Sequence, residues 1–274
     1  MTFWIVTPSY NQLSWLKLCL ASVRDQLRPN IAVHHHVQDA SSTDGTPEYL
    51  AEFSRQPAIA GYGFSFTSEP DRGMYDAINR GWLLAPAGVD VIAHLNCDEQ
   101  YLPEALKKVA EAFSRHPKAD ILLADMVVVD KDGGYICHRR SLRPHVWTSR
   151  FCCAGFTATT FQRATVVQGK KVLFDTSWRN LGDKVWYNAL HKAGCRFAVF
   201  NEMVSVFVDT GANLNWTEQG LREKQRYERK FLYGSATAVR LVSRMLGVRR
   251  ILKEIGADFD YDMGSGWRLF AGGG

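Results

Sequence analysis

Short apolar runs alternate with helical patterns over the first hundred residues. FWIVTPSY, IAVHHHVQDA, FSFTSEP and VDVIAHLN predict strands that end in turn residues. Helices are predicted over 13–23, from Pro47 onward, over 74–84 and over 103–115, and Ser14 is the predicted cap of the first. This alternation indicates an α/β fold, a sheet with crossover helices on its faces.

The pattern changes after residue 120. ADILLADMVVVD and YICHRR flank a Lys-Asp-Gly-Gly turn and predict a hairpin. A helix follows over 183–193, and RFAVF and VSVFVD predict two late strands. Beyond these strands the chain is basic and helical, with no obvious second core. We therefore expect a catalytic domain over 1–215 and a helical tail over 216–274.

Composition narrows the classes of protein. The 274 residues, 46% of them hydrophobic, are enough for one substantial core or two closely joined ones. The opening residues resemble a first strand rather than a signal peptide. No later window approaches the roughly twenty consecutive apolar residues of a membrane span. We expect a soluble, cytoplasmic protein, at most peripheral on the inner face of the membrane. A net charge of +5 suits phosphates or anionic lipid and is too mild for nucleic acid.

Two composition features resemble metal tracts. The six cysteines lack C-x-x-C spacing, and the adjacent Cys152 and Cys153 suit neither a zinc knuckle nor an ordinary disulfide, so reduced structural thiols are expected. Alternate residues of a strand face opposite ways, so at most two of His34, His35 and His36 can share a ligand. We interpret this histidine run as a polar strand end.

Carboxylates follow three of the predicted strands. Asp39 ends the second strand, Glu69 and Asp71 follow the third, and Asp98 and Glu99 follow the fourth. Ligands of doubly wound sheets bind at these strand ends. Neighbouring acids repel one another unless a cation lies between them, and a divalent metal that carries a diphosphate is a natural candidate.

Each acid also has a purely structural interpretation. Asp39 lies in a Ser, Thr, Asp and Gly cluster and is a candidate turn acid. Asp71 can cap a helix with Arg72 and Gly73, and the acids at 98–99 can cap the helix near residue 103. Their joint placement at strand ends favours the functional interpretation.

Four segments resemble, in order and spacing, the signature of family 2 glycosyltransferases of the GT-A fold. They are TPSYN at 7–11, QDASSTDGT at 38–46, DRGMYDAINRG at 71–81 and LNCDE at 95–99. The resemblance covers roughly residues 1–210 and is nearest to bacterial members that assemble surface polysaccharides. It implies a mixed, mostly parallel, Rossmann-like sheet flanked by helices, with a nucleotide-sugar half over 1–100 and an acceptor half over 101–215.

The resemblance also implies roles for individual residues. The acid matching Asp39 holds the nucleobase, and Asp98 and Glu99 serve the metal, Mn²⁺ or Mg²⁺, and the ribose. Members usually have two aspartates there, so the longer Glu99 either displaces the metal or leaves Asp98 as its main ligand. The implied donor-binding residues are Thr7, Pro8, Ser9, Tyr10, Asp39, Ser41, Asp71, Arg72, Gly73, Tyr75, Asp76, Asn79 and Asn96.

The implied catalytic base is Asp183, in the segment NLGDKVWYNAL. Gly182 stands where the family often has a first acid, and the alternative is that Asp183 only caps its helix. The implied reaction is an inverting, metal-dependent transfer of a hexose from a UDP-, GDP- or dTDP-linked donor to the hydroxyl of a saccharide or lipid-linked acceptor. Cell-surface polysaccharide or glycolipid assembly is the implied setting.

The basic tail leaves two interpretations open. Arginines and apolar residues mix over 240–251, as they do in helices that lie on an anionic membrane surface, and the wider region 216–255 is the candidate. A helix packed on the catalytic domain with its charges in water predicts much the same pattern.

Rival functions have different signatures. An inactive nucleotide-sugar-binding module of the same fold differs only in its lack of turnover. A nucleotidyltransferase would carry a Gly-rich, Lys- or Arg-bearing loop after the first strand, and TPSYNQ is not one. A nicotinamide dehydrogenase would carry G-x-G-x-x-G there, which is absent.

Overall fold

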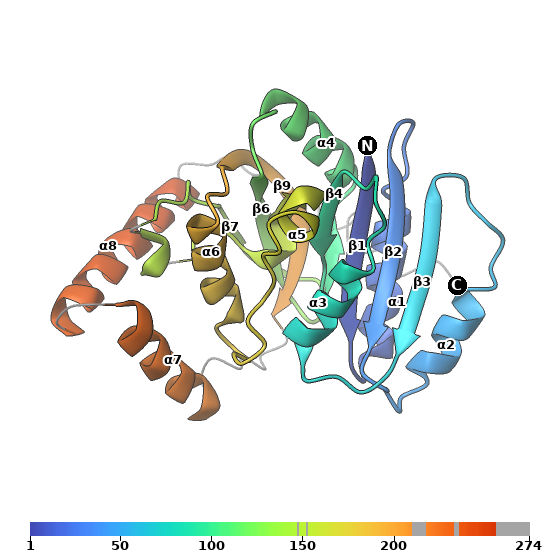
Figure 1. Ribbon diagram of the computed structural model, residues 1–274, viewed down its shortest axis with the longest axis horizontal. Helices are drawn as coiled ribbons and strands as arrows, with labels where there is room; N and C mark the ends of the chain where they lie inside the picture. The colour runs from blue at the N-terminus through green and yellow to red at the C-terminus, as the bar shows by residue number, and fades with distance from the viewer. Residues whose placement is uncertain (147, 152, 210–217, 233–235, 256–274) are drawn as a thin grey trace.

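One mixed sheet organises the chain (Figure 1). The computed structural model describes residues 1–146, 148–151, 153–209, 218–232 and 236–255. The strands are β1 (Thr2–Ser9), β2 (Ala32–Asp39), β3 (Tyr62–Ser68), β4 (Val91–His94), β5 (Glu99–Tyr101), β6 (Ile121–Asp130), β7 (Tyr135–Arg139), β8 (Thr160–Arg163) and β9 (Phe197–Asp209). The α-helices are α1 (Leu13–Arg24), α2 (Thr46–Phe53), α3 (Met74–Leu83), α4 (Ala105–Arg115), α5 (Ala164–Gln168), α6 (Gly182–Lys192), α7 (Glu218–Phe231) and α8 (Ala236–Ile255), and the 3-10 helices are η1 (Thr148–Arg150) and η2 (Thr157–Thr159).

The sheet has a parallel half and a mixed half. Its order in the described residues is β3-β2-β1-β4-β8-β6-β9-β5, and β7 pairs with β6. β3, β2, β1 and β4 run parallel to one another. β8 lies between β4 and β6 and is antiparallel to both, and β6 is parallel to β9. The predicted mixed, mostly parallel α/β fold is confirmed. The carboxyl ends of the four parallel strands therefore meet at one edge.

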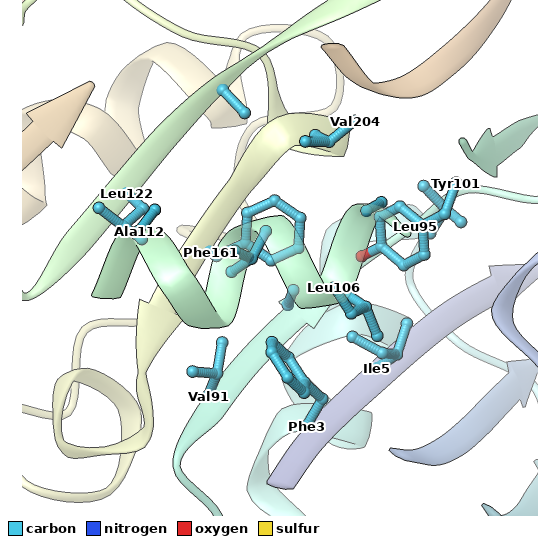
Figure 2. Close-up of a cluster of buried hydrophobic side chains, with 14 of the residues drawn as sticks. Phe3, Ile5, Val91, Leu95, Tyr101, Leu106, Ala112, Leu122, Phe161 and Val204 are labelled. Atoms are coloured by element: carbon cyan, nitrogen blue, oxygen red, sulfur yellow. The ribbon is translucent and has the colours of Figure 1, made fainter. Parts of the chain in front are cut away.

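Helices cover both faces of the sheet, as the alternation along β1 requires. Phe3 and Ile5 pack in one core with residues of α1 and α4, including Leu106 (Figure 2). Trp4 and Val6 pack in a second core with residues of α3, α5 and α6. Each such fully buried side chain contributes about 1.5–3 kcal/mol to folding. Both cores hold the parallel strand ends in place.

Two local predictions are wrong. Ser14 lies inside α1 and not at its cap; the carboxylate of Asp44, from the loop after β2, accepts the backbone N–H of Leu13 at 2.8 Å. The two predicted late strands form one strand, β9. The ladder between β6 and β9 shifts register near Asp125, and this bulge absorbs the polar residues that separate the two apolar runs.

The histidine run lies within β2 and not at a strand end, so that part of its interpretation is wrong. The predicted alternation is confirmed. His34 and His36 both contact the Ser65 hydroxyl, at 2.7 and 2.9 Å, and His35 faces the other way and contacts the Thr7 hydroxyl at 2.8 Å. Burial lowers the pKa of His35 to about 3. These histidines are neutral groups that fasten β2 to its neighbours.

The cysteines are free thiols where the structure describes them. Cys19, Cys97 and Cys195 are buried, and Cys137 and Cys153 are partly exposed. The expectation for Cys152 lies outside the described residues. Structural thiols therefore fit the described part of the chain.

Two helices, α7 and α8, lie in the predicted tail, at the end of the molecule far from β3 (Figure 1), and the part of that prediction over 256–274 lies outside the described residues. α7 is not free, because its Tyr227 packs with Trp178 and Val185 in a small buried cluster. In the part of the chain that the structure describes, no helix has the length and apolar character to cross a membrane.

Candidate active site

A cavity of about 770 Å³ opens at the carboxyl edge of the parallel strands. The predicted donor and metal residues on its wall are Pro8, Ser9, Tyr10, Asp71, Arg72, Gly73, Asn96 and Asp98. The wall residues outside that prediction are Gln12, Ala40, Pro70, Met74, Ala77, Cys97 and Arg179. The ends of four strands, β1 to β4, therefore meet at one cavity, as the topology requires.

Asp39 lies beneath the rim of this cavity. Its carboxylate is fully buried and accepts hydrogen bonds from the Ser42 backbone N–H at 3.0 Å and from the Ser68 hydroxyl at 2.6 Å. Ser41 is exposed and adopts a left-handed φ of 56°, which turns the chain so that Ser42 reaches Asp39. Asp39 therefore makes the contacts of a turn acid, and the adjacent Ala40 lies on the cavity wall. Thr7 is also buried, with its hydroxyl on His35.

The segment after β3 is held by its own acids. Asp71 accepts the Gly73 backbone N–H at 2.7 Å, and Gly73, the N-cap of α3, has a φ of 112°, a conformation that favours glycine. The buried Asp76 pairs with Arg72 at 2.9 Å and with Arg80 at 2.8 Å. Burial alone would raise the pKa of Asp76, but the hydrogen bonds and charges of these arginines bring it below its ordinary value. Asp76 therefore shapes the loop from behind the wall.

Asn79 and Tyr75 connect α3 to the segment that contains Phe174. The Asn79 amide donates to the Phe174 carbonyl and accepts its N–H, both at 2.9 Å. Phe174 stacks on the buried ring of Tyr75, with ring centres 4.8 Å apart. Neither Asn79 nor Tyr75 lies on the cavity wall. Both residues position the elements that do.

Asp98 and Glu99 diverge. Asp98 lines the cavity, whereas the buried Glu99 carboxylate accepts the Asn96 backbone N–H at 2.8 Å. Burial raises the pKa of Asp98, and burial together with the charge of Asp98 raises the pKa of Glu99. A cation at this pair would relieve both effects.

The residues present fit a hard divalent cation. The Asn96 side-chain oxygen is buried and has no hydrogen-bond partner among the described residues, so it is a second oxygen next to Asp98. Within those residues, no group of three or more His, Cys, Asp or Glu side chains could hold a metal. A cation here would take further oxygens from phosphate and water, as Mg²⁺ and Mn²⁺ do.

Asp183 lies in the first turn of α6, half-buried, and does not line the cavity. One carboxylate oxygen accepts the Lys184 backbone N–H at 2.7 Å, so a capping contact is present. Burial raises the pKa of Asp183 despite the opposing effect of Lys184. A half-exposed carboxylate with a raised pKa can accept a proton from an incoming hydroxyl.

Sequence reasoning missed two residues near the site, Arg179 and Glu223. Arg179 reaches the cavity from a loop more than one hundred positions after Asp71. Glu223, on α7, accepts backbone N–H groups of that loop. Neither residue lies in a motif, and no local signal marks either one.

Comparisons with known proteins agree with this architecture. Over 111 residues, the chain is 33% identical to "Uncharacterized glycosyltransferase Rv1514c" of Mycobacterium tuberculosis H37Rv and to "Uncharacterized glycosyltransferase MT1564" of strain CDC 1551. Each match covers 40% of this chain and 39% of the relative, so the matched region spans about two fifths of these curated relatives.

Two solved structures are similar in fold. S. aureus TarS 1-349 in complex with UDP-GlcNAc has a TM-score of 0.59 and 17% identity, over 95% of this chain and 68% of TarS 1-349. The mannosyltransferase PcManGT from Pyrobaculum calidifontis, in complex with GDP-Man and Mn²⁺, has a TM-score of 0.60 and 12% identity, over 94% of this chain and 76% of PcManGT. At these identities the likeness establishes the GT-A fold alone.

The family model for Glycosyl transferase family 2 matches residues 4–204, which include all the predicted site residues. The match extends from the first strand to β9 and so covers both halves of the sheet. This chain therefore belongs to glycosyl transferase family 2.

Proposed function

We propose that the protein transfers a sugar from a nucleotide-diphosphate donor to an acceptor hydroxyl, with inversion at the anomeric carbon. The observation that carries the proposal is the cavity at the carboxyl edge, where Asp98 and Arg72 lie on one wall and α6 is joined to α3 behind it. The solved structures of similar fold hold UDP-GlcNAc or GDP-Man, which supports a nucleotide-sugar donor.

Asp98 and Asn96 would hold a divalent cation, Mn²⁺ or Mg²⁺, in this proposal, and Glu99 would orient their loop. Such a cation neutralises charge that builds on a leaving diphosphate. The PcManGT complex contains Mn²⁺, which supports a divalent cation here. The exposed ring of Tyr10, on the cavity wall, offers a flat surface for the nucleobase.

Asp183 would act as the general base. The acceptor oxygen attacks the anomeric carbon while the bond to the diphosphate oxygen breaks, and the hydroxyl proton passes to the Asp183 carboxylate. One carboxylate oxygen accepts the Lys184 N–H, and within the described part of the chain the other accepts a hydrogen bond only from the Cys153 thiol, at 3.9 Å. A positioned base contributes about two to four orders of magnitude in rate.

The acceptor side follows from the same division of the chain. Residues 1–100 would bind the donor, 101–215 the acceptor, and 216–255 an anionic membrane surface that presents a lipid-linked acceptor. Exposed Leu241, Met245 and Val248 alternate with exposed Arg240 and Arg244 on α8, which supports this surface. Peripheral attachment to the inner face of the membrane and a role in surface polysaccharide assembly belong to this proposal.

A thermal-shift screen of UDP, GDP, dTDP and CMP, each with and without Mn²⁺, tests the donor class. A ligand that binds only the folded protein raises its melting temperature, so one nucleotide should do so and more strongly with metal. No shift with any of the four would reject the proposal. Tight nucleotide binding without transfer from any donor would instead indicate an inactive binding module.

A further inference from the structure

An arginine that has no ionic partner among the described residues reaches the proposed donor cavity from the loop before α6. Arg179 lies on the cavity wall, exposed, in the loop before α6. One nitrogen of its guanidinium lies next to Gly73, 3.5 Å from where a β-carbon would stand. Its side chain makes no hydrogen bond or ion pair within the described part of the chain, whereas Arg72 is bound to Asp76.

The backbone beneath Arg179 is held by a carboxylate from α7. Glu223 accepts the N–H groups of Arg179 at 2.7 Å, Asn180 at 2.8 Å and Leu181 at 3.1 Å. Only 8% of Glu223 is exposed. Backbone N–H bonds to an ionised carboxylate are charge-assisted and strong. Three of them on consecutive residues define the path of the loop.

α7 is itself anchored against this loop. The Arg226 guanidinium lies over the Trp178 ring at 4.1 Å from its centre and bonds the Ser177 carbonyl at 2.9 Å. The Tyr227 hydroxyl accepts from the Asn188 amide at 2.7 Å and donates to the Arg150 carbonyl at 3.1 Å. These contacts hold α7, and with it Glu223, in one position relative to the loop.

We propose that Arg179 binds the diphosphate of the donor and that Glu223 is its positioning residue, which holds the loop so that the guanidinium faces the cavity. This inference rests on the proposed function. A divalent cation offsets only part of the charge of the nucleoside diphosphate that is released as the sugar leaves, and the other arginine on the wall is paired with Asp76. A guanidinium suits the remaining phosphate oxygens because it can donate two parallel hydrogen bonds.

Isothermal titration calorimetry in the presence of Mn²⁺ tests the role of Arg179. UDP and GDP are the probes, with uridine and guanosine as the matching ligands without phosphate. Arg179→Ala should weaken the diphosphate that the wild type binds by about tenfold to a hundredfold, the usual effect of losing a charged hydrogen bond, and leave the nucleoside unaffected. The diphosphate affinity of Arg179→Lys should lie between those of the wild type and Arg179→Ala.

The matched control is Arg55→Ala, since Arg55 is also exposed and lies outside the cavity wall. It should bind the diphosphate as the wild type does. Equal binding by Arg179→Ala and wild type would overturn the inference and leave the proposed function standing. Failure of the wild type to bind any nucleotide would reject the proposed function itself.

A double-mutant cycle tests Glu223. Glu223→Gln keeps one oxygen acceptor but loses the charge, and Glu218→Gln is the exposed control on the same helix. Glu223→Gln should weaken diphosphate binding by about threefold to tenfold, less than Arg179→Ala, and raise the donor KM more than it lowers kcat, because its bonds hold the loop and do not contact the diphosphate. In the Arg179→Ala background, Glu223→Gln should cause no further loss of diphosphate affinity. Additive losses, or wild-type behaviour of Glu223→Gln in a folded protein, would overturn the positioning role.

Discussion

The backbone N–H of Asp183 donates a hydrogen bond to the Tyr75 hydroxyl at 3.2 Å. This bond joins the first turn of α6 to α3, so the helix that follows the donor loop also locates the proposed base. Tyr75 is in turn stacked on Phe174, whose backbone is bound by Asn79. The donor segment therefore determines the position of a residue more than one hundred positions away.

Tyr75→Phe should lower kcat several-fold with little change in nucleotide affinity, because it leaves the Asp183 N–H without its acceptor. The free energy of unfolding should fall by about 1–3 kcal/mol. Tyr187→Phe is the control, since its buried hydroxyl bonds Thr160 at 2.6 Å and should cost similar stability without lowering kcat. Steady-state kinetics and thermal unfolding measure both effects, and equal kcat losses in the two variants would contradict the prediction.

Asp183→Asn should reduce kcat by about a hundredfold to ten thousandfold and leave nucleotide binding intact. The base must be ionised, so kcat/KM falls as the pH drops through the pKa of Asp183. Because burial raises that pKa above 3.8, the acidic limb should lie at a higher pH than an ordinary aspartate gives. A pH profile checks this, and an unchanged rate in the variant would rule Asp183 out as the base.

Asp98→Asn should abolish the Mn²⁺-dependent part of nucleotide binding, because Asp98 is the acid that faces the cavity. Glu99→Gln should have a smaller effect, since the buried Glu99 side chain bonds the Asn96 backbone. Calorimetry with and without Mn²⁺ separates the two. A larger loss from Glu99→Gln would reverse the assignment of the main ligand.

The double substitution of Leu241→Glu and Met245→Glu should weaken binding to anionic vesicles by about tenfold or more, given the burial energy of apolar side chains. Leu84→Glu is the control, because Leu84 is similarly exposed but lies on the catalytic body. Co-sedimentation with phosphatidylglycerol and phosphatidylcholine vesicles measures the effect. Equal binding to both lipids, or no effect of the double substitution, would favour the alternative of a helix packed with its charges in water.

Gly182→Ala should lower the free energy of unfolding by about 1–3 kcal/mol, since a β-carbon at this position would overlap the Tyr75 ring. Gly247→Ala is the control on α8, where nothing stands in the way, and should be neutral or stabilising by about 0.5–1 kcal/mol. Chemical denaturation compares the two. The same overlap is a physical reason for a glycine at position 182.

Much of the parallel half was predictable because its signals are local. Strand ends such as Asp39 and Asp98 follow apolar runs directly, and the topology then gathers them at one edge. Ser14 was mistaken for a cap because Asp44, which comes from a distant loop, is the residue that reaches the start of α1. Similarly, the bulge near Asp125 joins two apparent strands.

The rest of the site depends on contacts distant in sequence. Glu223 lies between Arg222 and Lys224 and therefore resembles any acid on a solvated helix face. Only the docking of α7 reveals that it binds the loop at Arg179. The sequence does not separate the roles of Asp98 and Glu99, because two adjacent acids do not indicate which side chain faces the cavity.

The contact between Glu223 of α7 and the loop at Arg179 has a practical consequence for protein engineering. The family match ends at residue 204, yet the loop beside the cavity relies on a helix that begins at Glu218. A fragment truncated at the family boundary would expose the ring of Trp178. It would also leave the backbone N–H groups of residues 179–181 without the Glu223 carboxylate. The smallest portion of this chain worth expressing alone therefore extends through Phe231.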